Sequence, residues 1–236
     1  MRAGDNNLLI LTFYIIGISY TINRMIESID DKINFSFGKA SVDEQLKKQE
    51  IFDDVGISFK LSPTYGLDDL KEVLMFVENK SKNLAVYVDW DNSSIVIEHS
   101  KQSMRVIRKS PDITRDLAVP QTPSLVAPQK TLTIAITSEN TFERDKETGT
   151  YNTKKPIVDI VGGLQKSPVK ANRIKFKKFM NEEITLEFSL QLVLRLSEVR
   201  VGLAPGQNKP PMCIVNCPFT IKKLPWTYAL PWNKKR

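Results

Sequence analysis

The sequence predicts an all-β fold, an immunoglobulin-like antiparallel β-sandwich preceded by one N-terminal membrane helix and a short amphipathic helix. Three observations predict it. Residues 8–22 form an uncharged apolar run, apolar and polar residues alternate in short segments from residue 57 onward, and turn-forming residues separate these segments. Alternation with a period of two is typical of strands that bury one face, and such strands at close spacing are typical of sandwiches and barrels.

Composition limits the class of protein. The chain has 236 residues, of which 41% are hydrophobic and 26% charged, so it is globular and long enough for one generous β domain or two small ones. The formal net charge of +7 is too modest to predict nucleic-acid binding by itself and is compatible with an anionic membrane surface.

Residues 1–24 are expected to form a membrane anchor or signal segment. The apolar run of residues 8–22 is shorter than the roughly 20 residues of a spanning helix and resembles the h-region of a signal peptide, which has about 7–15. We expect an uncleaved signal-anchor that is lengthened by residues 6–7 and 23–24. Cleavage after Ser19 and a buried core helix are the alternatives. The anchor makes the protein a single-pass membrane protein, with its β domain on the extracytoplasmic side.

Residues 25–56 are expected to form a linker that contains a short helix from about Val42 to Asp53. Ser41 as N-cap and Glu44 three residues later have the order of a capping box, and Gly56 would end the segment.

The β-sandwich domain is expected over residues 57–224 and a Pro/Trp/basic tail over residues 225–236. A proline-rich crossover is expected at 110–129, a long loop or hairpin end at 140–155, a short strand or loop at 157–164, and a Gly/Pro loop at 199–211. The predicted strands cover residues 57–61, 70–78, 84–90, 95–97, 104–108, 130–137, 183–196 and 212–224.

Residues 84–108 are predicted to form the structural hairpin of the domain. Val86, Val88 and Trp90 share one face, so Trp90 is expected to be a core anchor. Asp91 to Ser94 supply turn residues at which the chain is expected to reverse, and Arg105 lies on the strand that follows.

The residues with catalytic chemistry are few. Asp89, Asp91 and Glu98 could serve as acid–base carboxylates or a cation site, but we expect the two aspartates to be turn and rim residues near Arg105. The one histidine, His99, lies in a polar turn, and no triad, P-loop or dinucleotide motif is present. No catalytic residue, metal site or cofactor is therefore predicted.

Cys213 and Cys217 are the only cysteines. On one extended strand their Cα atoms would lie about 13 Å apart, beyond the reach of a disulfide. They are expected to be small buried apolar residues, with their oxidation left open.

A basic segment at residues 166–178 has a structural and a functional interpretation. The structural one, which we favour, is an edge strand or rim protected by lysines. The functional one is a contact with phosphates of lipid head groups or nucleic acid, since Ile174, Phe176 and Phe179 interleave with six basic residues. The six basic residues are Lys166, Lys170, Arg173, Lys175, Lys177 and Lys178.

The run VYVDWDNSS, followed by RVIR and TPSLVAPQKTL, resembles bacterial envelope proteins of unassigned role, either lipoproteins or membrane-anchored β-sandwiches. The resemblance covers residues 70–138, and it implies an immunoglobulin-like sandwich outside the cytoplasm without catalytic residues. The chain departs from that pattern by lacking a lipobox cysteine and by having Gln-Lys where the last turn often has Gly. The matching positions are Trp90, Asp91, Ser93, Ser94, Arg105, Val106, Pro123, Val126 and Pro128.

Together these features predict a non-enzymatic, membrane-tethered binding or assembly module whose partner is another envelope protein or lipid head groups. The alternatives are a carboxylate-dependent envelope hydrolase and a soluble protein that binds nucleic acid through residues 166–178.

Overall fold

The computed structural model describes residues 3–109, 119–147, 149–198 and 212–230. The helices are α1 (Ala3–Asp30), α2 (Lys39–Lys48) and α3 (Lys170–Met180), with single turns η1 (Glu139–Thr141), η2 (Val161–Gln165) and η3 (Trp226–Ala229). The strands are β1 (Lys32–Phe37), β2 (Val55–Lys60), β3 (Tyr65–Gly66), β4 (Val73–Asn79), β5 (Leu84–Ile97), β6 (Gln102–Arg108), β7 (Ser124–Val126), β8 (Thr131–Ser138), β9 (Phe142–Arg144), β10 (Tyr151–Thr153), β11 (Leu186–Glu198) and β12 (Cys213–Lys223).

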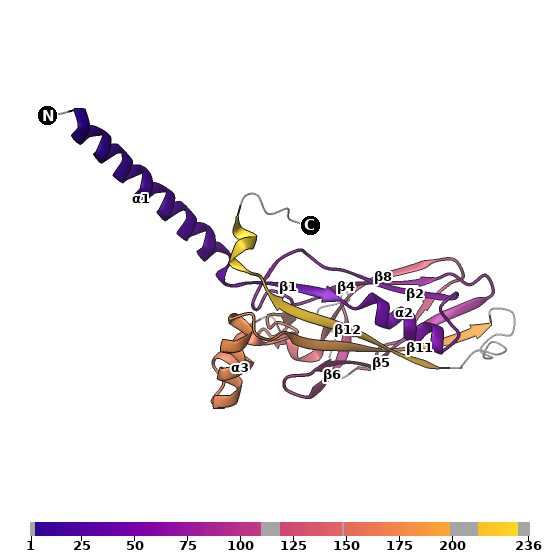
Figure 1. Cartoon of the computed structure of the whole chain (residues 1–236). Coiled ribbons are helices and arrows are strands. Elements are labelled where there is room, and N and C mark those ends of the chain that lie inside the picture. Colours follow the sequence, from indigo (N-terminus) through magenta and orange to yellow (C-terminus); the bar gives the residue numbers. More distant parts are fainter. Residues whose placement is uncertain (1–2, 110–118, 148, 199–211, 231–236) are drawn as a thin grey trace.

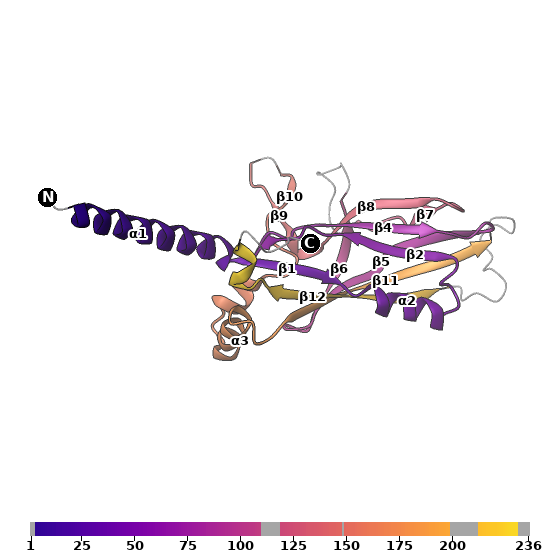
Figure 2. The ribbon, with the colours of Figure 1, turned by 45° about the horizontal axis from the view of Figure 1, so that its top comes forward.

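The protein is mostly β, with one curled antiparallel sheet that follows an N-terminal apolar helix in the chain (Figures 1 and 2). This confirms the prediction of a β-rich fold preceded by an apolar helix. Ten strands belong to this half-barrel in the order β2-β4-β8-β6-β5-β11-β12-β1-β3, with β7 beside β5. The immunoglobulin-like sandwich is not confirmed. One half of β6 pairs with β5 and the other half with β8, so hydrogen bonding continues where two separate sheets would have parted.

The predicted chain reversal at Asp91–Ser94 is wrong, because β5 continues through these residues to Ile97. The turn-forming residues make a bulge instead. Asp89 pairs with Val193 and Ser94 with Gln191, so five residue steps on β5 lie opposite two on β11. The carboxylate of Asp89 accepts hydrogen bonds from the backbone N–H and side chain of Asn92, which folds the bulge locally. The reversal comes at residues 98–101, between β5 and β6, where Lys101 has a positive φ of 53°.

A polar clamp holds the bulge against the segment that follows residue 118. Asp91 pairs with the Arg105 guanidinium and accepts the Gln121 backbone N–H at 2.9 Å. The Gln121 side chain in turn donates to the Val106 carbonyl at 2.7 Å and accepts the Arg108 N–H at 2.9 Å. Gln121 thus replaces a neighbouring strand along this part of β6.

Glutamine side chains on and just after helix α2 bond to the free backbone groups of β12, as Gln121 does for β6. Gln45 donates to the carbonyl of Asn216 at 2.7 Å and accepts its N–H at 2.8 Å, and Gln49 donates to the Ile214 carbonyl at 2.9 Å. The predicted capping box is wrong, because α2 starts at Lys39 after Gly38 and has no side-chain cap. Gly38 instead donates its backbone N–H to the Pro218 carbonyl, which places the helix start on the sheet edge.

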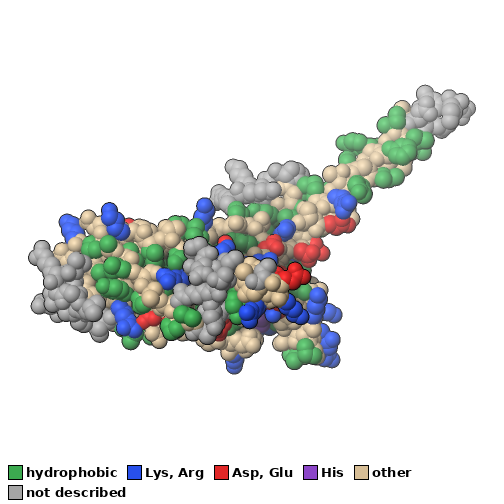
Figure 3. Space-filling view, turned by 180° about the vertical axis from the view of Figure 1, so that it is seen from behind, with side chains coloured by type: hydrophobic (Ala, Val, Ile, Leu, Met, Phe, Trp, Pro, Cys, Tyr) green, Lys and Arg blue, Asp and Glu red, His purple; other side chains and the backbone are tan. Residues whose placement is uncertain are grey.

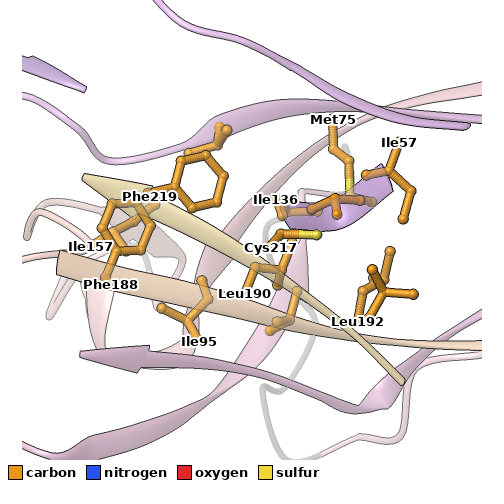
Figure 4. Close-up of a cluster of buried hydrophobic side chains, with 14 of the residues drawn as sticks. Ile57, Met75, Ile95, Ile136, Ile157, Phe188, Leu190, Leu192, Cys217 and Phe219 are labelled. Carbon is orange, nitrogen blue, oxygen red and sulfur yellow. The ribbon is translucent and has the colours of Figure 1, made fainter. Parts of the chain in front are cut away.

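The core lies inside the curl of the sheet. Trp90 is fully buried, as predicted, and its indole N–H donates to Ser124 at 2.9 Å. Side chains from β2, β4, β5, β8, β11 and β12 meet in the interior shown in Figure 4, where the rings of Phe188 and Phe219 stack 4.7 Å apart. A cavity of about 10 Å³ remains there. It has room for about one water molecule and is too small for a ligand.

Three further segments differ from the prediction. β1 lies inside the sheet between β12 and β3, so the β domain begins ahead of residue 57, where the sequence analysis placed a linker. The segment 157–164, expected to be a strand or loop, contributes to the single π-helical turn η2. The basic segment 166–178 contains most of helix α3 and is not an edge strand. The predicted loop 199–211, much of the proline-rich crossover and the end of the tail, including Trp232, lie outside the described residues.

Candidate membrane-contact site

Helix α1 exposes apolar side chains around its whole circumference. Asn7–Asp30 is 24 residues long and contains an 18-residue stretch with a mean hydropathy of 1.4, none of which is buried against the domain, so the helix is long and apolar enough to cross a membrane. Leu8 and Phe13 are two-thirds exposed. A helix of a water-exposed domain normally hides one stripe of such residues, so α1 has the surface of a segment that lies in hydrocarbon.

The C-terminal end of the apolar run has interfacial chemistry. Tyr20 lies one helical turn before Arg24, whose guanidinium lies 6.0 Å from the tyrosine ring centroid and also pairs with Glu27 at 3.5 Å. Tyrosine and arginine side chains of this kind are typical of a membrane–water boundary.

α1 is joined to the β domain almost without a linker, since Asp31 alone separates it from β1. The Lys223 ammonium donates to the Ile29 carbonyl at 3.1 Å and to the Leu224 carbonyl at 2.9 Å. A cation near the last carbonyls of a helix satisfies unpaired acceptors and interacts favourably with the helix dipole. The turn η3 also contacts α1. Lys223 was not predicted to have this role, because nothing near it in the sequence indicates a helix end almost 200 residues away.

Helix α3 lies at the end of the β domain from which α1 departs (Figures 1 and 2). It packs through Phe179, which is fully buried, and through Phe176 and Met180, which contact the main core. Its basic side chains lie elsewhere on its surface: Lys170, Arg173, Lys177 and Lys178 are exposed, and Lys175 is half-buried. Lys166 is exposed just ahead of the helix. All six predicted contact residues are therefore brought together on or beside one helix.

His99 lies close to η2 and within electrostatic range of Lys175 of α3. Its Nδ1 atom is buried without a hydrogen-bond partner, and its Nε2 atom faces Gly163 of η2. Burial lowers the pKa of His99, Lys175 lowers it further, and Asp159 opposes these effects. The histidine therefore stays neutral near pH 7 and lies between the β5–β6 turn and η2.

The structure separates the carboxylates considered for an acid–base or cation site: Asp89 and Asp91 each pair with an arginine, and Glu98 does not join them. Asp89 is buried and accepts a 2.6 Å hydrogen bond from Arg195 of β11, and Asp91 belongs to the clamp with Arg105. Partial burial alone would raise the pKa of Asp91, but hydrogen bonds from Gln121 and Arg105 outweigh it and lower the pKa. Glu98 is exposed, and among the described residues no group of three or more His, Cys, Asp or Glu side chains could hold a metal ion.

Both cysteines are buried free thiols, as predicted for small apolar residues. They lie four residues apart on β12. Burial raises the pKa of Cys213 to about 11 and that of Cys217 further. The thiolate is the reactive form, so these thiols are protected from modification at neutral pH.

Comparisons with known proteins add no assignment. No family model matches the chain, and no curated protein matches it. One solved structure, titled "Crystal structure of protein from Archaeoglobus fulgidus", is 12% identical with a TM-score of 0.25, and the match covers 72% of this chain and 97% of that one. A likeness at that TM-score carries no argument about fold or function.

Proposed function

We propose that this protein is a membrane-tethered, extracytoplasmic binding or assembly module without enzymatic activity. The observation that carries the proposal is α1, which exposes apolar side chains on all sides and continues almost directly into the first strand of the β domain. Moving this surface from water into a bilayer is favourable at about 25 cal/mol per Å² of apolar area. The single-pass arrangement is supported by α1, which is the one candidate span among the described residues.

The tether holds the domain close to the bilayer. Residues 23–30 are helical and lie beyond the apolar run, and they extend about 12 Å at the helical rise of 1.5 Å per residue. The Lys223 contacts then tie the helix end to the sheet. We infer a module that works at a short, defined distance from the membrane surface.

Two observations support the remaining parts of the proposal. The resemblance of residues 70–138 to envelope proteins supports the extracytoplasmic side. Ion pairing of Asp89 with Arg195 and of Asp91 with Arg105 supports an architectural role for the carboxylates.

A protease-protection experiment on the full chain in bacterial cells tests the proposal. We expect the protein to stay in the membrane fraction after carbonate washing, and a protease added outside intact spheroplasts to digest the β domain. A cytoplasmic protein in the same cells serves as the control for intact membranes. Release by carbonate would contradict the tether, and digestion only after lysis would contradict the extracytoplasmic side.

A further inference from the structure

The outward face of α3 presents positive charge and one apolar residue together. Lys170, Arg173, Ile174 and Lys177 follow the spacing i, i+3, i+4, i+7, so they lie on one side of the helix. Phe179 and Phe176 point to the core on the other side. Ile174 remains 45% exposed among the basic side chains, and Val169, just ahead of the helix, is 53% exposed.

The basic side chains of this helix, and Lys166 just ahead of it, have no ion-pair partner in the part of the chain that the structure describes. In the view of Figure 3 several Lys and Arg side chains gather at the end of the domain from which α1 departs. Clusters of four to eight Lys and Arg residues that bind anionic lipids are best known from the cytoplasmic side of a membrane helix, and the same attraction acts wherever anionic headgroups face such a cluster.

The location of α3 favours lipid over nucleic acid as the ligand of its basic face. α3 and the C-terminal end of α1 lie at the same end of the domain, which the short helical segment 23–30 holds near the bilayer (Figures 1 and 2). Single-stranded nucleic acid is commonly bound by exposed aromatic rings on which bases stack. On α3 the phenylalanines are turned inward, and the exposed apolar residue is an isoleucine, which suits the headgroup–acyl boundary.

We propose that the outward face of α3 is a second membrane contact, on which anionic phospholipid headgroups bind Lys170, Arg173, Lys177 and Lys178 while Ile174 reaches the interfacial region. This inference rests on the proposed membrane tether. The two contacts differ in kind: α1 lies in hydrocarbon, and α3 binds phosphate through charge. Together they set the orientation of the β domain on the membrane, which one helix alone leaves free to rotate.

The test uses the full chain in nanodiscs, either of phosphatidylcholine alone or of phosphatidylcholine mixed with phosphatidylglycerol. An amine-acylating reagent reports the accessibility of each lysine, read by mass spectrometry of peptides. We expect Lys170, Lys177 and Lys178 to react several-fold more slowly in the anionic discs, and high salt to remove the difference. Lys47 and Lys48 on α2 are the internal control and should react equally in both discs.

A charge-reversed variant, Lys170→Glu/Lys177→Glu/Lys178→Glu, adds a second readout. These side chains are exposed, so the fold should survive. With an environment-sensitive fluorophore on Ile174→Cys, we expect a blue shift in anionic discs that the charge-reversed variant loses. The buried native thiols should not take up the label.

The outcomes separate the two proposals. A chain that does not co-purify with discs contradicts the tether. A chain that co-purifies, but whose α3 lysines react equally in both discs, overturns the α3 contact and leaves the tether standing. Protection by a single-stranded oligonucleotide in neutral discs, without protection by anionic lipid, would assign the face to nucleic acid and also overturn it.

Discussion

The helices α1 and α3 meet the same end of the β domain, yet they relate to it in opposite ways. α1 buries none of its apolar span against the domain, whereas α3 buries Phe179 and shows its basic residues to the outside. The apolar side chains of residues 8–22 therefore pack against none of the described residues of the domain, whereas the phenylalanines of α3 pack against the core. The two helices therefore differ in which side chains they leave exposed: apolar ones on α1 and basic ones on α3. No residue of α1 belongs to the described core, so its apolar surface is available to a bilayer. α3 packs into the fold through Phe179 and exposes its basic side chains.

The largest effect is expected from placing charge in α1. Ile15→Lys/Ile16→Lys at the middle of the apolar run should cost about 5–7 kcal/mol of insertion free energy, since a central lysine costs roughly 2.5–3.5 kcal/mol. Carbonate washing should then release the protein, with its circular dichroism spectrum otherwise preserved. Ile15→Leu/Ile16→Leu is the matched control and should stay in the membrane. Retention of the double-lysine variant would mean that α1 is not the tether.

The next largest effect separates the two faces of α3. Phe179→Ala should reduce the free energy of unfolding by about 3–5 kcal/mol, because it leaves a cavity where a fully buried ring packed. Ile174→Ala, on the exposed face, should change it by about 0.5 kcal/mol or less. Urea unfolding of both variants measures the difference. Equal effects would show that the two faces are not distinct.

A smaller effect is expected where α1 joins the domain. Lys223→Met keeps the length of the side chain but removes the ammonium that donates to Ile29 and Leu224. We expect about 1 kcal/mol of lost stability and a wider distribution of angles between α1 and the sheet. Spin labels on Ile22→Cys and Ile174→Cys should give a broader distance distribution in this variant. An unchanged distribution would show that β1 and η3 hold the helix without Lys223.

The smallest effect is expected in how the free energy of unfolding depends on pH through His99. The pKa of His99 in the folded protein lies below its ordinary value of 6.5, so the folded state binds fewer protons than the unfolded state. The stabilisation from neutral His99 is complete above about pH 6.5 and falls as the pH drops toward the lowered pKa. His99→Gln should remove this part of the pH dependence, as measured by thermal unfolding at several pH values. An identical loss in the variant would place the proton uptake elsewhere.

Sequence reasoning succeeds where a pattern depends on neighbouring residues alone. The alternation in residues 183–196 predicted β11 and its buried face, and Leu186, Leu190 and Leu194 are indeed buried. The same alternation is present in KINFSF, where Ile33 and Phe35 are buried in β1, so β1 was detectable from the sequence.

The failures come from segments that satisfy two patterns. In residues 173–177 basic and apolar side chains alternate as in a strand, and the overlapping segment 176–179 places Phe176 and Phe179 three residues apart as on a helix. Packing of Phe179 into the core, beside η2, selects the helix. The turn residues of β5 are a similar case: Ser93 receives the Val193 N–H and Asp89 pairs with Arg195, so β11, a hundred residues later, holds the chain as a bulge.

The sequence by itself determined the apolar run, the period of most strands and the burial of Trp90, because hydrophobicity and side-chain alternation are local properties. The tertiary structure alone decided that β5 passes through its turn residues, that Gln45 and Gln121 close free strand edges, and that α3 lies at the end of the domain from which α1 departs. Each of these depends on hydrogen bonds or packing between residues far apart in the chain, whose free energy exceeds local preference only once the sheet has formed.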